Sequence, residues 1–171
     1  GFTLAAALKA VGPHAEVVVA ELVSAVIAWN QTHLSALANH PLNDKRTTVY
    51  EGDVGKLIRS ETQGFDAILL DTPCSGEGTI RKDPLAMRNW SQQAIDEISN
   101  TQKGLIESAF HALKEDGILI YSTCTLSHEE NQNICHSLKE SFPDSVEFVN
   151  LSNLFPGAEQ STTKDGFLHI W

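Results

Sequence analysis

The chain has 171 residues, 42% hydrophobic and 20% charged, and its 22 acidic against 12 basic side chains give a formal net charge of -10. This composition predicts one soluble globular domain and excludes a disordered or collagen-like chain. The acidic surplus argues against gripping nucleic acid by bulk charge, because phosphates are neutralised by Lys and Arg. No apolar run reaches the roughly 18 residues of a membrane span, and no signal-peptide pattern is present, so we expect a cytoplasmic protein without a membrane partner.

Three cysteines are too few for a disulfide framework, and none has the CxxC spacing of a zinc ribbon or a thioredoxin-type centre. They are Cys74, Cys124 and Cys135. The seven histidines are scattered and show no metal-binding spacing. We therefore expect a reducing compartment, no metal, and cysteines that are either buried or chemically active.

Strand-like apolar runs alternate with helical stretches through the first half of the chain. The expected elements are a helix over residues 3–11, a strand at 17–20, a helix over 22–39, a strand at 47–50 and a strand at 65–71. The runs at 17–20 and 65–71 have the continuous hydrophobicity of buried parallel strands.

The second half continues the alternation after a loop at 72–89 that is rich in Gly, Pro and charge. Ser91 is the expected N-cap of a helix that runs to about residue 114. A strand follows at 117–122, and Ser127 with Glu130 has the S-x-x-E spacing of a capping box that opens a helix to about residue 142. A last strand is expected at 146–149.

This alternation predicts an α/β fold, with a mostly parallel, Rossmann-like sheet and helices on both faces. We expect a single domain over residues 1–171. A doubly wound fold starts on a strand, whereas this chain starts on a glycine that leads into a helix. We therefore expect the first strand to be missing and the domain to be truncated.

Acidic residues follow three of the expected strands, at the edge where open α/β sheets bind their ligands. Glu21 can accept hydrogen bonds from ribose hydroxyls, and it can equally be an acid at a helix N-terminus. Asp53 can bind an adenine amino group, although alone it is more simply an N-cap. Asp71 ends the third strand. A nucleoside cofactor is thus one of two interpretations of these acids.

The loop from Asp71 to Pro84 is harder to explain as a simple turn. It lacks the Gly-Lys-Ser/Thr of a Walker loop and the third glycine of a dinucleotide fingerprint, and the spacing of Cys74 and Arg81 is one residue too long for a phosphatase loop. It does contain a carboxylate and a thiol three apart, two glycines that allow close backbone approach, and a basic pair, Arg81 and Lys82, suited to phosphate. The alternative is a glycine-rich turn with an ordinary buried cysteine.

Cys124 lies at the end of the next strand, directly before an expected helix. Neighbouring strands lie about 4.8 Å apart, so Cys74 and Cys124 can meet in one pocket. A thiol near a helix N-terminus has a lowered pKa, which suits a nucleophile. One such cysteine is more often packing, but two on one edge beside an aspartate favour chemistry.

Two motifs together resemble those of RNA cytosine-5 methyltransferases of the RsmB/RsmF (Nop/Sun) type. They are D-x-P-C-S-G-x-G-x-x-R-K-x-P at residues 71–84 and Y-S-T-C-T-L-x-x-x-E-N at residues 121–131. The RsmF branch is the most similar at three further stretches, residues 89–91, 154–158 and 166–169. The resemblance implies the class I S-adenosylmethionine-dependent methyltransferase fold and an RNA substrate, namely small-subunit ribosomal RNA.

The resemblance also implies a role for each site residue. Cys124 is the implied nucleophile, which adds to carbon 6 of cytosine so that carbon 5 accepts a methyl group from S-adenosyl-L-methionine. Cys74 is implied to assist product release, and Asp71 to bind the target base. The residues implied to hold the cofactor are Gly1, Phe2, Thr3, Glu21, Asp53 and Asp71, with Glu21 at the ribose and Asp53 at the adenine.

Arg81 and Lys82, with Arg88, are the basic residues expected to meet RNA phosphates. The chain has no lysine where the family's glycine turn carries one. We also expect the family's flanking RNA-binding regions to be missing from this sequence. We therefore expect the chain, as a monomer, to bind RNA weakly and to have little or no activity alone. A degenerate core that only binds RNA or a partner is the alternative, while a nicotinamide-dependent oxidoreductase would leave Cys74 and Cys124 without a role.

Overall fold

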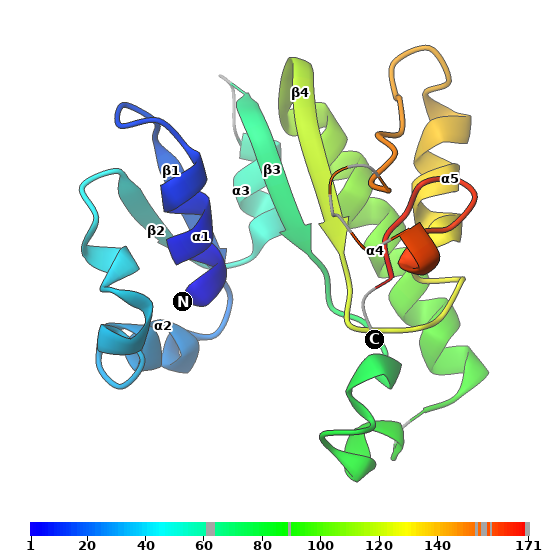
Figure 1. Cartoon of the computed structure of the whole chain (residues 1–171), viewed down its shortest axis with the longest axis horizontal. Coiled ribbons are helices and arrows are strands. Elements are labelled where there is room, and N and C mark those ends of the chain that lie inside the picture. Colours follow the sequence, from blue (N-terminus) through cyan, green and yellow to red (C-terminus); the bar gives the residue numbers. More distant parts are fainter. Residues whose placement is uncertain (61–63, 89, 153, 155–156, 158, 170–171) are drawn as a thin grey trace. The chain divides into compact units, whose positions relative to one another are not determined.

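The computed structural model describes residues 1–60, 64–88, 90–152, 154, 157 and 159–169 (Figure 1). The chain divides into two compact units, Gly1–Thr62 and Gln63–Trp171. Each unit contains one pair of parallel strands. The single domain that we expect over residues 1–171 stays a prediction.

The first unit is built on two strands that pair in parallel, β1 (Val17–Glu21) and β2 (Thr47–Glu51). Its helices are α1 (Phe2–Ala10), α2 (Ser24–Gln31) and α3 (Val54–Ser60), and two 3₁₀ turns, Ala36–Ala38 and Pro41–Asn43, lie between α2 and β2. Leu4 and Leu8 of α1 are buried because they lie four residues apart on one face of that helix. The helix expected over residues 3–11 and the strands expected at 17–20 and 47–50 are confirmed to within one residue at each end.

The helix expected over residues 22–39 is wrong in its second half, because α2 ends at Gln31. Two side chains bind carbonyls of the preceding turn: Asn30 Nδ2 donates to Val26 O and Thr32 Oγ1 donates to Ala28 O, each at 2.8 Å. Such bonds compete with the helical ladder. None of the residues of α2 is buried, so packing does not prolong the helix either.

The second unit is a βαβ arrangement of β3 (Phe65–Asp71), α4 (Gln92–Ala112) and β4 (Leu113–Ser122). The two strands are parallel, and the register aligns Asp71 with Ser122. The bounds predicted for β3 are confirmed, as is the N-cap of α4, where Ser91 Oγ accepts the Ala94 N–H at 3.1 Å. β4 begins earlier than expected, since Leu113 already pairs with Phe65.

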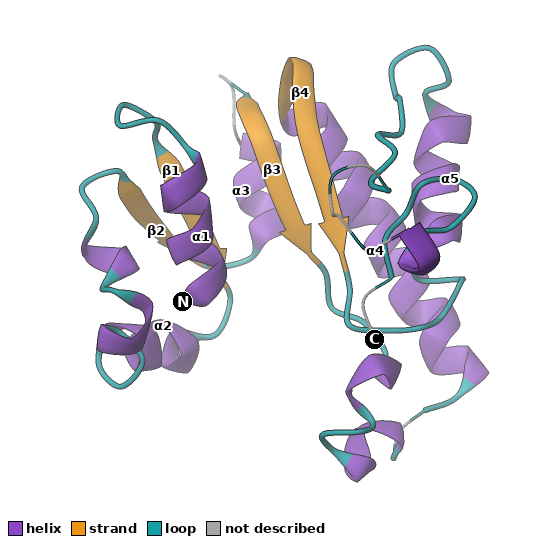
Figure 2. Cartoon of the chain, in the orientation of Figure 1, coloured by secondary structure: helices purple, strands orange, loops and turns teal. Residues whose placement is uncertain are grey.

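Helix α4 packs against β3 and β4, and α5 (Gln132–Ser141) packs against α4 (Figure 2). The buried apolar residues of this layer are Leu70, Ile95, Ile106, Ala109, Ala112, Ile134 and Leu138. On the other face of the strand pair, Leu69, Ile118 and Ile120 are exposed. Since side chains alternate across a strand, these three share one face, and Leu70 lies on the opposite one.

The strand expected at residues 146–149 is not formed. The Lys139 ammonium donates to the carbonyls of Pro143 and Val146, so these groups are satisfied by a side chain rather than by a strand ladder. Phe148 packs edge-on against Phe167, with ring centroids 5.1 Å apart. The apolar pattern of this stretch therefore reflects packing, not pairing.

Candidate active site

Two thiols meet beyond the carboxyl ends of β3 and β4. Cys74 follows β3 and Cys124 follows β4, and their Sγ atoms are 3.1 Å apart. Cys124 is exposed and Cys74 is half-buried. The prediction that these two thiols approach each other is confirmed.

The loop after β3 reaches Cys124 because it carries glycine at the point of contact. The Gly78 N–H donates to the Cys124 carbonyl at 3.0 Å, and a Cβ added at Gly78 would lie 2.8 Å from that oxygen. Gly76 has a φ of 75°, in the left-handed region that favours glycine. The close approach expected of both glycines is confirmed for Gly78, whereas Gly76 is favoured by its left-handed backbone.

The two thiols differ in exposure, and burial changes the acidity of Cys74. Burial, and then the hydrogen bond with Cys124, raise the pKa of Cys74 to about 11, so Cys74 is a thiol at neutral pH. The exposed thiol is therefore the one that can meet a substrate as a nucleophile. The expectation that Cys124 sits at a helix N-terminus is wrong, since α5 begins eight residues later at Gln132.

Asp71 is the last residue of β3 and lies at the same edge as the thiols. It is exposed, and its Oδ1 accepts a hydrogen bond from Ser122 Oγ at 3.1 Å. This contact fixes one oxygen from the neighbouring strand, and the second oxygen of the carboxylate is suited to an N–H donor of a bound base.

A buried polar cluster beneath the thiols was not predicted as part of the site. Its centre is Glu130, whose carboxyl group accepts hydrogen bonds from Ser75, Gln102 and Thr125. Glu130 and Gln102 have no exposed surface. The signal in the sequence was the S-x-x-E spacing, which indicates a local capping role instead.

In the first unit, Glu21 and Asp53 lie at the carboxyl ends of β1 and β2. Glu21 Oε1 accepts the Val23 N–H at 2.9 Å, and Asp53 Oδ1 accepts the Gly55 N–H at 2.8 Å. Each thus fills the local role that was its alternative interpretation. Each carboxylate has a second oxygen, so both also fit the hydroxyl and amino donors of an adenosine.

The remaining residues expected at the cofactor lie at the start of this unit. Gly1 is the N-cap of α1, and Phe2 and Thr3 form its first turn. A Cβ at Gly1 would meet the side-chain oxygen of Asn30, so Gly1 lies directly beside α2.

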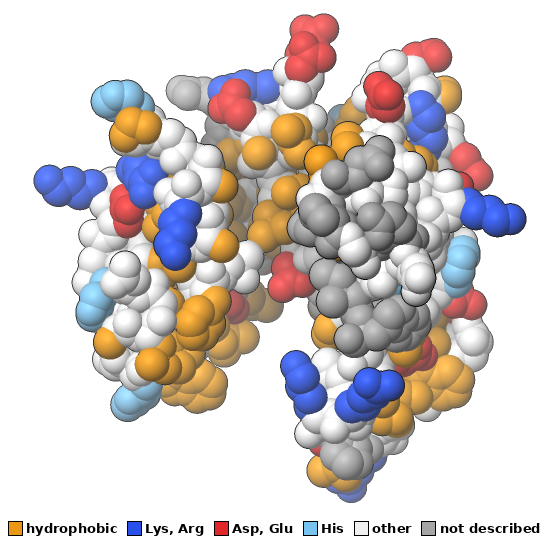
Figure 3. Space-filling model, in the orientation of Figure 1, with side chains coloured by type: hydrophobic (Ala, Val, Ile, Leu, Met, Phe, Trp, Pro, Cys, Tyr) orange, Lys and Arg blue, Asp and Glu red, His pale blue; other side chains and the backbone are white. Residues whose placement is uncertain are grey.

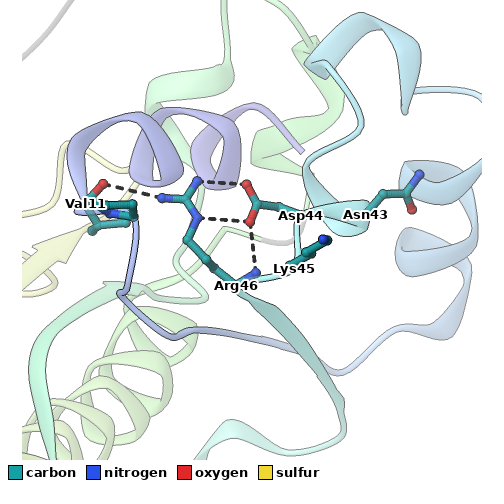
Figure 4. A pocket seen from close by; sticks show the side chains of 6 residues that line it. Val11, Asn43, Asp44, Lys45 and Arg46 are labelled. Atoms are coloured by element: carbon teal, nitrogen blue, oxygen red, sulfur yellow. Dashed lines mark hydrogen bonds and ion pairs between the residues drawn. The ribbon is translucent and has the colours of Figure 1, made fainter.

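A hollow of about 650 Å³ in the first unit lies at the opposite, amino ends of β1 and β2 (Figure 4). It is lined by Val11, Pro13, Asn43, Asp44, Lys45 and Arg46. The Arg46 guanidinium forms a 2.8 Å ion pair with Asp44 and donates to the Gly12 carbonyl at 3.2 Å. These bonds brace the chain segments, and parallel sheets bind ligands at their carboxyl ends, so we do not place the cofactor here.

The expected RNA contacts are exposed on the loop that follows the thiol site. Arg81, Lys82 and Arg88 lie in and beside the 3₁₀ turns Glu77–Thr79 and Pro84–Met87. Lys and Arg side chains project from this segment into solvent (Figure 3). Their charge is therefore available to phosphate groups.

Parts of the stretches that resemble the RsmF branch lie outside the described residues, namely residues 89, 155, 156 and 158. In the part of the chain that is described, no three His, Cys, Asp or Glu side chains are grouped to hold a metal ion. Nor does any helix of that part have the length and apolarity to cross a membrane.

A parallel α/β fold that brings an aspartate and two thiols to the carboxyl ends of its strands defines a Rossmann-like protein with a cysteine-based site. Residues 12–166 match the family model of the 16S rRNA methyltransferase RsmB/F, and the chain belongs to this family.

Curated relatives agree with this assignment. The ribosomal RNA small subunit methyltransferase F of Psychromonas ingrahamii is 69% identical over 107 residues, which are 63% of this chain and 22% of the relative. The protein of the same name from Aliivibrio fischeri is 66% identical over 107 residues, covering 63% of this chain and 23% of the relative. The matched stretch is thus less than a quarter of these relatives.

Solved structures confirm the methyltransferase fold. NSun6 from Pyrococcus horikoshii, solved with SFG, is 25% identical with a TM-score of 0.62, and the match covers 81% of this chain and 33% of that one. PH0851 is 26% identical with a TM-score of 0.64, covering 75% of this chain and 28% of that one.

Proposed function

We propose that this chain is part of the catalytic core of an S-adenosylmethionine-dependent methyltransferase that modifies carbon 5 of a cytosine in small-subunit ribosomal RNA. The observation that carries the proposal is the 3.1 Å contact between the sulfurs of Cys74 and Cys124. Two thiols at one site suit a reaction in which one sulfur bonds to the base and a second helps to release it.

Cys124 is the nucleophile in this proposal. Its thiolate forms a bond to carbon 6 of cytosine, and the electron pair of the C5–C6 double bond moves to carbon 5. Asp71 accepts a hydrogen bond from the base and holds it at this edge. S-adenosylmethionine, when bound, supplies the methyl group that carbon 5 accepts.

Release reverses the addition. Carbon 5 loses its proton to solvent, the C5–C6 double bond forms again, and the bond between carbon 6 and the Cys124 sulfur breaks. Cys74 is a protonated thiol because burial raises its pKa to about 11. From 3.1 Å it can donate its S–H to the departing sulfur, which stabilises the leaving thiolate.

The proposals for the cofactor and for the substrate are supported by different observations. Glu21 and Asp53 would hold the ribose and the adenine of S-adenosylmethionine, and the solved relative that carries SFG, an analogue of this cofactor, supports its use. The names of the curated relatives support ribosomal RNA as substrate. Exposed Arg81 and Lys82 would meet its phosphates.

The test uses the whole protein that carries this sequence, S-adenosylmethionine, and small-subunit ribosomal RNA in which 5-fluorocytidine replaces cytidine. Fluorine at carbon 5 cannot leave as a proton, so the reaction stops at the covalent adduct, which is measured on denaturing gels. Cys124→Ala should lower adduct formation by about 10³-fold or more, because it removes the nucleophile. Cys74→Ala should still form the trapped adduct on this RNA. On unmodified RNA, where the wild type releases the base, Cys74→Ala should accumulate the adduct because release is slowed.

Cys135→Ala is the matched control, since Cys135 is a half-buried thiol in α5. It should form the adduct at the wild-type rate. An adduct that persists in Cys124→Ala would contradict the assignment of the nucleophile. A wild-type protein that binds the RNA but forms no adduct would support the degenerate core instead.

A further inference from the structure

Glu130 is a fully buried carboxyl group to which none of the roles above is assigned. It has no exposed surface, and it lies in the turn that precedes α5. Removing a carboxyl group from water costs several kcal/mol unless hydrogen bonds replace the lost hydration. Its partners therefore indicate which segments this group was placed to hold.

Those partners come from three separate segments. Glu130 Oε2 accepts the Ser75 N–H at 2.8 Å and the Gln102 Nε2 amide at 3.1 Å. Glu130 Oε1 accepts the Thr125 hydroxyl at 3.3 Å. One carboxyl group thus joins the loop after β3, the middle of α4 and the loop after β4.

Each of the two loops is held directly beside a cysteine. Ser75 follows Cys74 and Thr125 follows Cys124 in the chain, and the hydroxyls of Ser75 and Thr125 are 2.7 Å apart. Glu130 touches neither sulfur, but it fixes a neighbour of each.

Gln102 forms a hydrogen bond on the other side of Cys74, to the preceding residue Pro73. Its Nε2 donates to the Pro73 carbonyl at 2.8 Å as well as to Glu130, so both N–H groups of the amide are used. The backbone is therefore hydrogen-bonded on both sides of Cys74, at Pro73 by Gln102 and at Ser75 by Glu130.

The contacts argue against a simple capping role for Glu130. In a capping box its side chain would return to the Ser127 N–H. That N–H instead donates to Thr125 Oγ1 at 3.2 Å, although Ser127 Oγ does accept the Glu130 N–H at 3.3 Å. The carboxyl group is thereby left to bind Ser75, which is 55 residues away in the chain.

We propose that Glu130 is a positioning residue that sets the spacing of the Cys74 and Cys124 sulfurs by holding Ser75 and Thr125. The relevance of this spacing to catalysis rests on the proposed function. One sulfur forms a bond that the other helps to break, so both must lie within reach of the same carbon. Displacements of about 1 Å at such a site cost on the order of 100-fold in rate.

The test compares Glu130→Gln with Glu129→Gln, the same change at the exposed neighbouring residue. The first arm needs no RNA: diamide oxidises the two thiols to a Cys74–Cys124 disulfide, taking up two electrons and two protons, and mass spectrometry gives the rate. Glu130→Gln places an amide N–H where an acceptor is needed, so we expect this rate to fall about tenfold or more. Glu129→Gln should match the wild type.

The second arm measures adduct formation in a single turnover on the 5-fluorocytidine RNA with the whole protein. We expect Glu130→Gln to lower the maximal rate about 100-fold and to change the RNA concentration at half-maximal rate by less than about threefold. A separate urea titration gives the folded fraction, and both rates are expressed per folded molecule. Should Glu130→Gln not fold, Thr125→Val keeps Glu130 with Ser75 and Gln102 but removes the hydroxyl that contacts Glu130, Ser75 and the Ser127 N–H. It should slow both reactions about threefold.

The outcomes separate the two proposals. Crosslinking and adduct rates of folded Glu130→Gln equal to those of Glu129→Gln would overturn the positioning role. A loss of stability without a change in either rate would also overturn it, because that is the effect of a structural residue alone. If the wild type forms no adduct while Glu130→Gln still slows crosslinking, the proposed function fails and the control of sulfur spacing stands.

Discussion

Two acidic side chains, one in each unit of the chain, are used in opposite ways. In the first unit Asp44 forms an ion pair with Arg46 in which both side chains remain partly exposed, at 29% and 22%. In the second unit Glu130 is fully buried and binds three neutral groups. One acid thus lies where water can replace its partner, and the other lies where only the protein can provide hydrogen bonds.

This difference predicts where substitutions matter. The attraction in a solvent-exposed ion pair is screened by water. When one partner is removed by substitution, the remaining charged group is hydrated instead. When a buried acceptor is removed, its donors stay buried without a hydrogen bond. Each donor then costs its full desolvation free energy. The groups around the thiols should therefore respond strongly to change, and those of the hollow around Arg46 weakly.

The largest expected effect concerns the half-buried thiols of the second unit. Burial raises the pKa of Cys74 and of Cys135 to about 11 in each case. Below this value the thiolate fraction rises tenfold per pH unit, so alkylation of both by iodoacetamide should accelerate about 100-fold from pH 7 to pH 9. Mass spectrometry of the alkylated peptides gives the two rates separately.

The substitution Cys124→Ser sharpens this test. It removes the sulfur whose hydrogen bond is the second cause of the raised pKa of Cys74, while burial, the first cause, remains. The alkylation of Cys74 should become faster at a given pH but still show no plateau below pH 9. A plateau at lower pH in the wild type would show that the thiol is not desolvated and would weaken the contrast.

The next effect is the stability of the buried cluster. Glu130→Ala removes the acceptor of the Ser75 N–H, the Gln102 amide and the Thr125 hydroxyl, and it should lower the free energy of unfolding by about 3 kcal/mol. Urea unfolding followed by circular dichroism measures this change. Glu129→Ala, at an exposed position, removes only the hydrogen bond that Glu129 accepts from Ser127 Oγ at 2.9 Å and should shift the midpoint much less. Equal midpoints for the two variants would remove the distinction between buried and exposed acids.

Local patterns were sufficient for elements whose cause is local. The apolar run of β3 and the cap at Ser91 were predicted correctly because each depends on neighbouring residues. The strand at 146–149 was wrong because strand formation needs a partner, which no local pattern provides. The convergence of Cys74 and Cys124 was predictable because parallel strands end at one edge.

The role of Glu130 was not predictable in the same way. Its spacing from Ser127 fits a capping box, and half of that motif is formed. Its carboxyl group nevertheless binds Ser75, and a contact across 55 residues depends on how β3, α4 and the turn before α5 pack. Glu130 belongs to the second family motif, residues 121–131, but the family resemblance implied no role for it.

The smallest expected effect is in the partly exposed ion pair of the first unit. The hydrogen bonds from Arg46 lower the pKa of Asp44 from 3.8 to about 2. Arg46→Ala should return the pKa of Asp44 toward 3.8, and an NMR titration of the Asp44 carboxyl group measures this shift.

The effect of this pair on stability has a defined pH window. Because the pKa is lowered in the folded state, the contribution is present above pH 4 and is lost as the pH falls from about 4 to about 2. Thermal unfolding of wild type and Arg46→Ala should therefore differ slightly at neutral pH and converge at pH 2. Lys45→Ala is the matched control, since it removes a neighbouring positive charge that lines the same hollow without a bond to Asp44. A loss of stability as large as that of Glu130→Ala would mean that exposure does not decide how much an acidic group contributes.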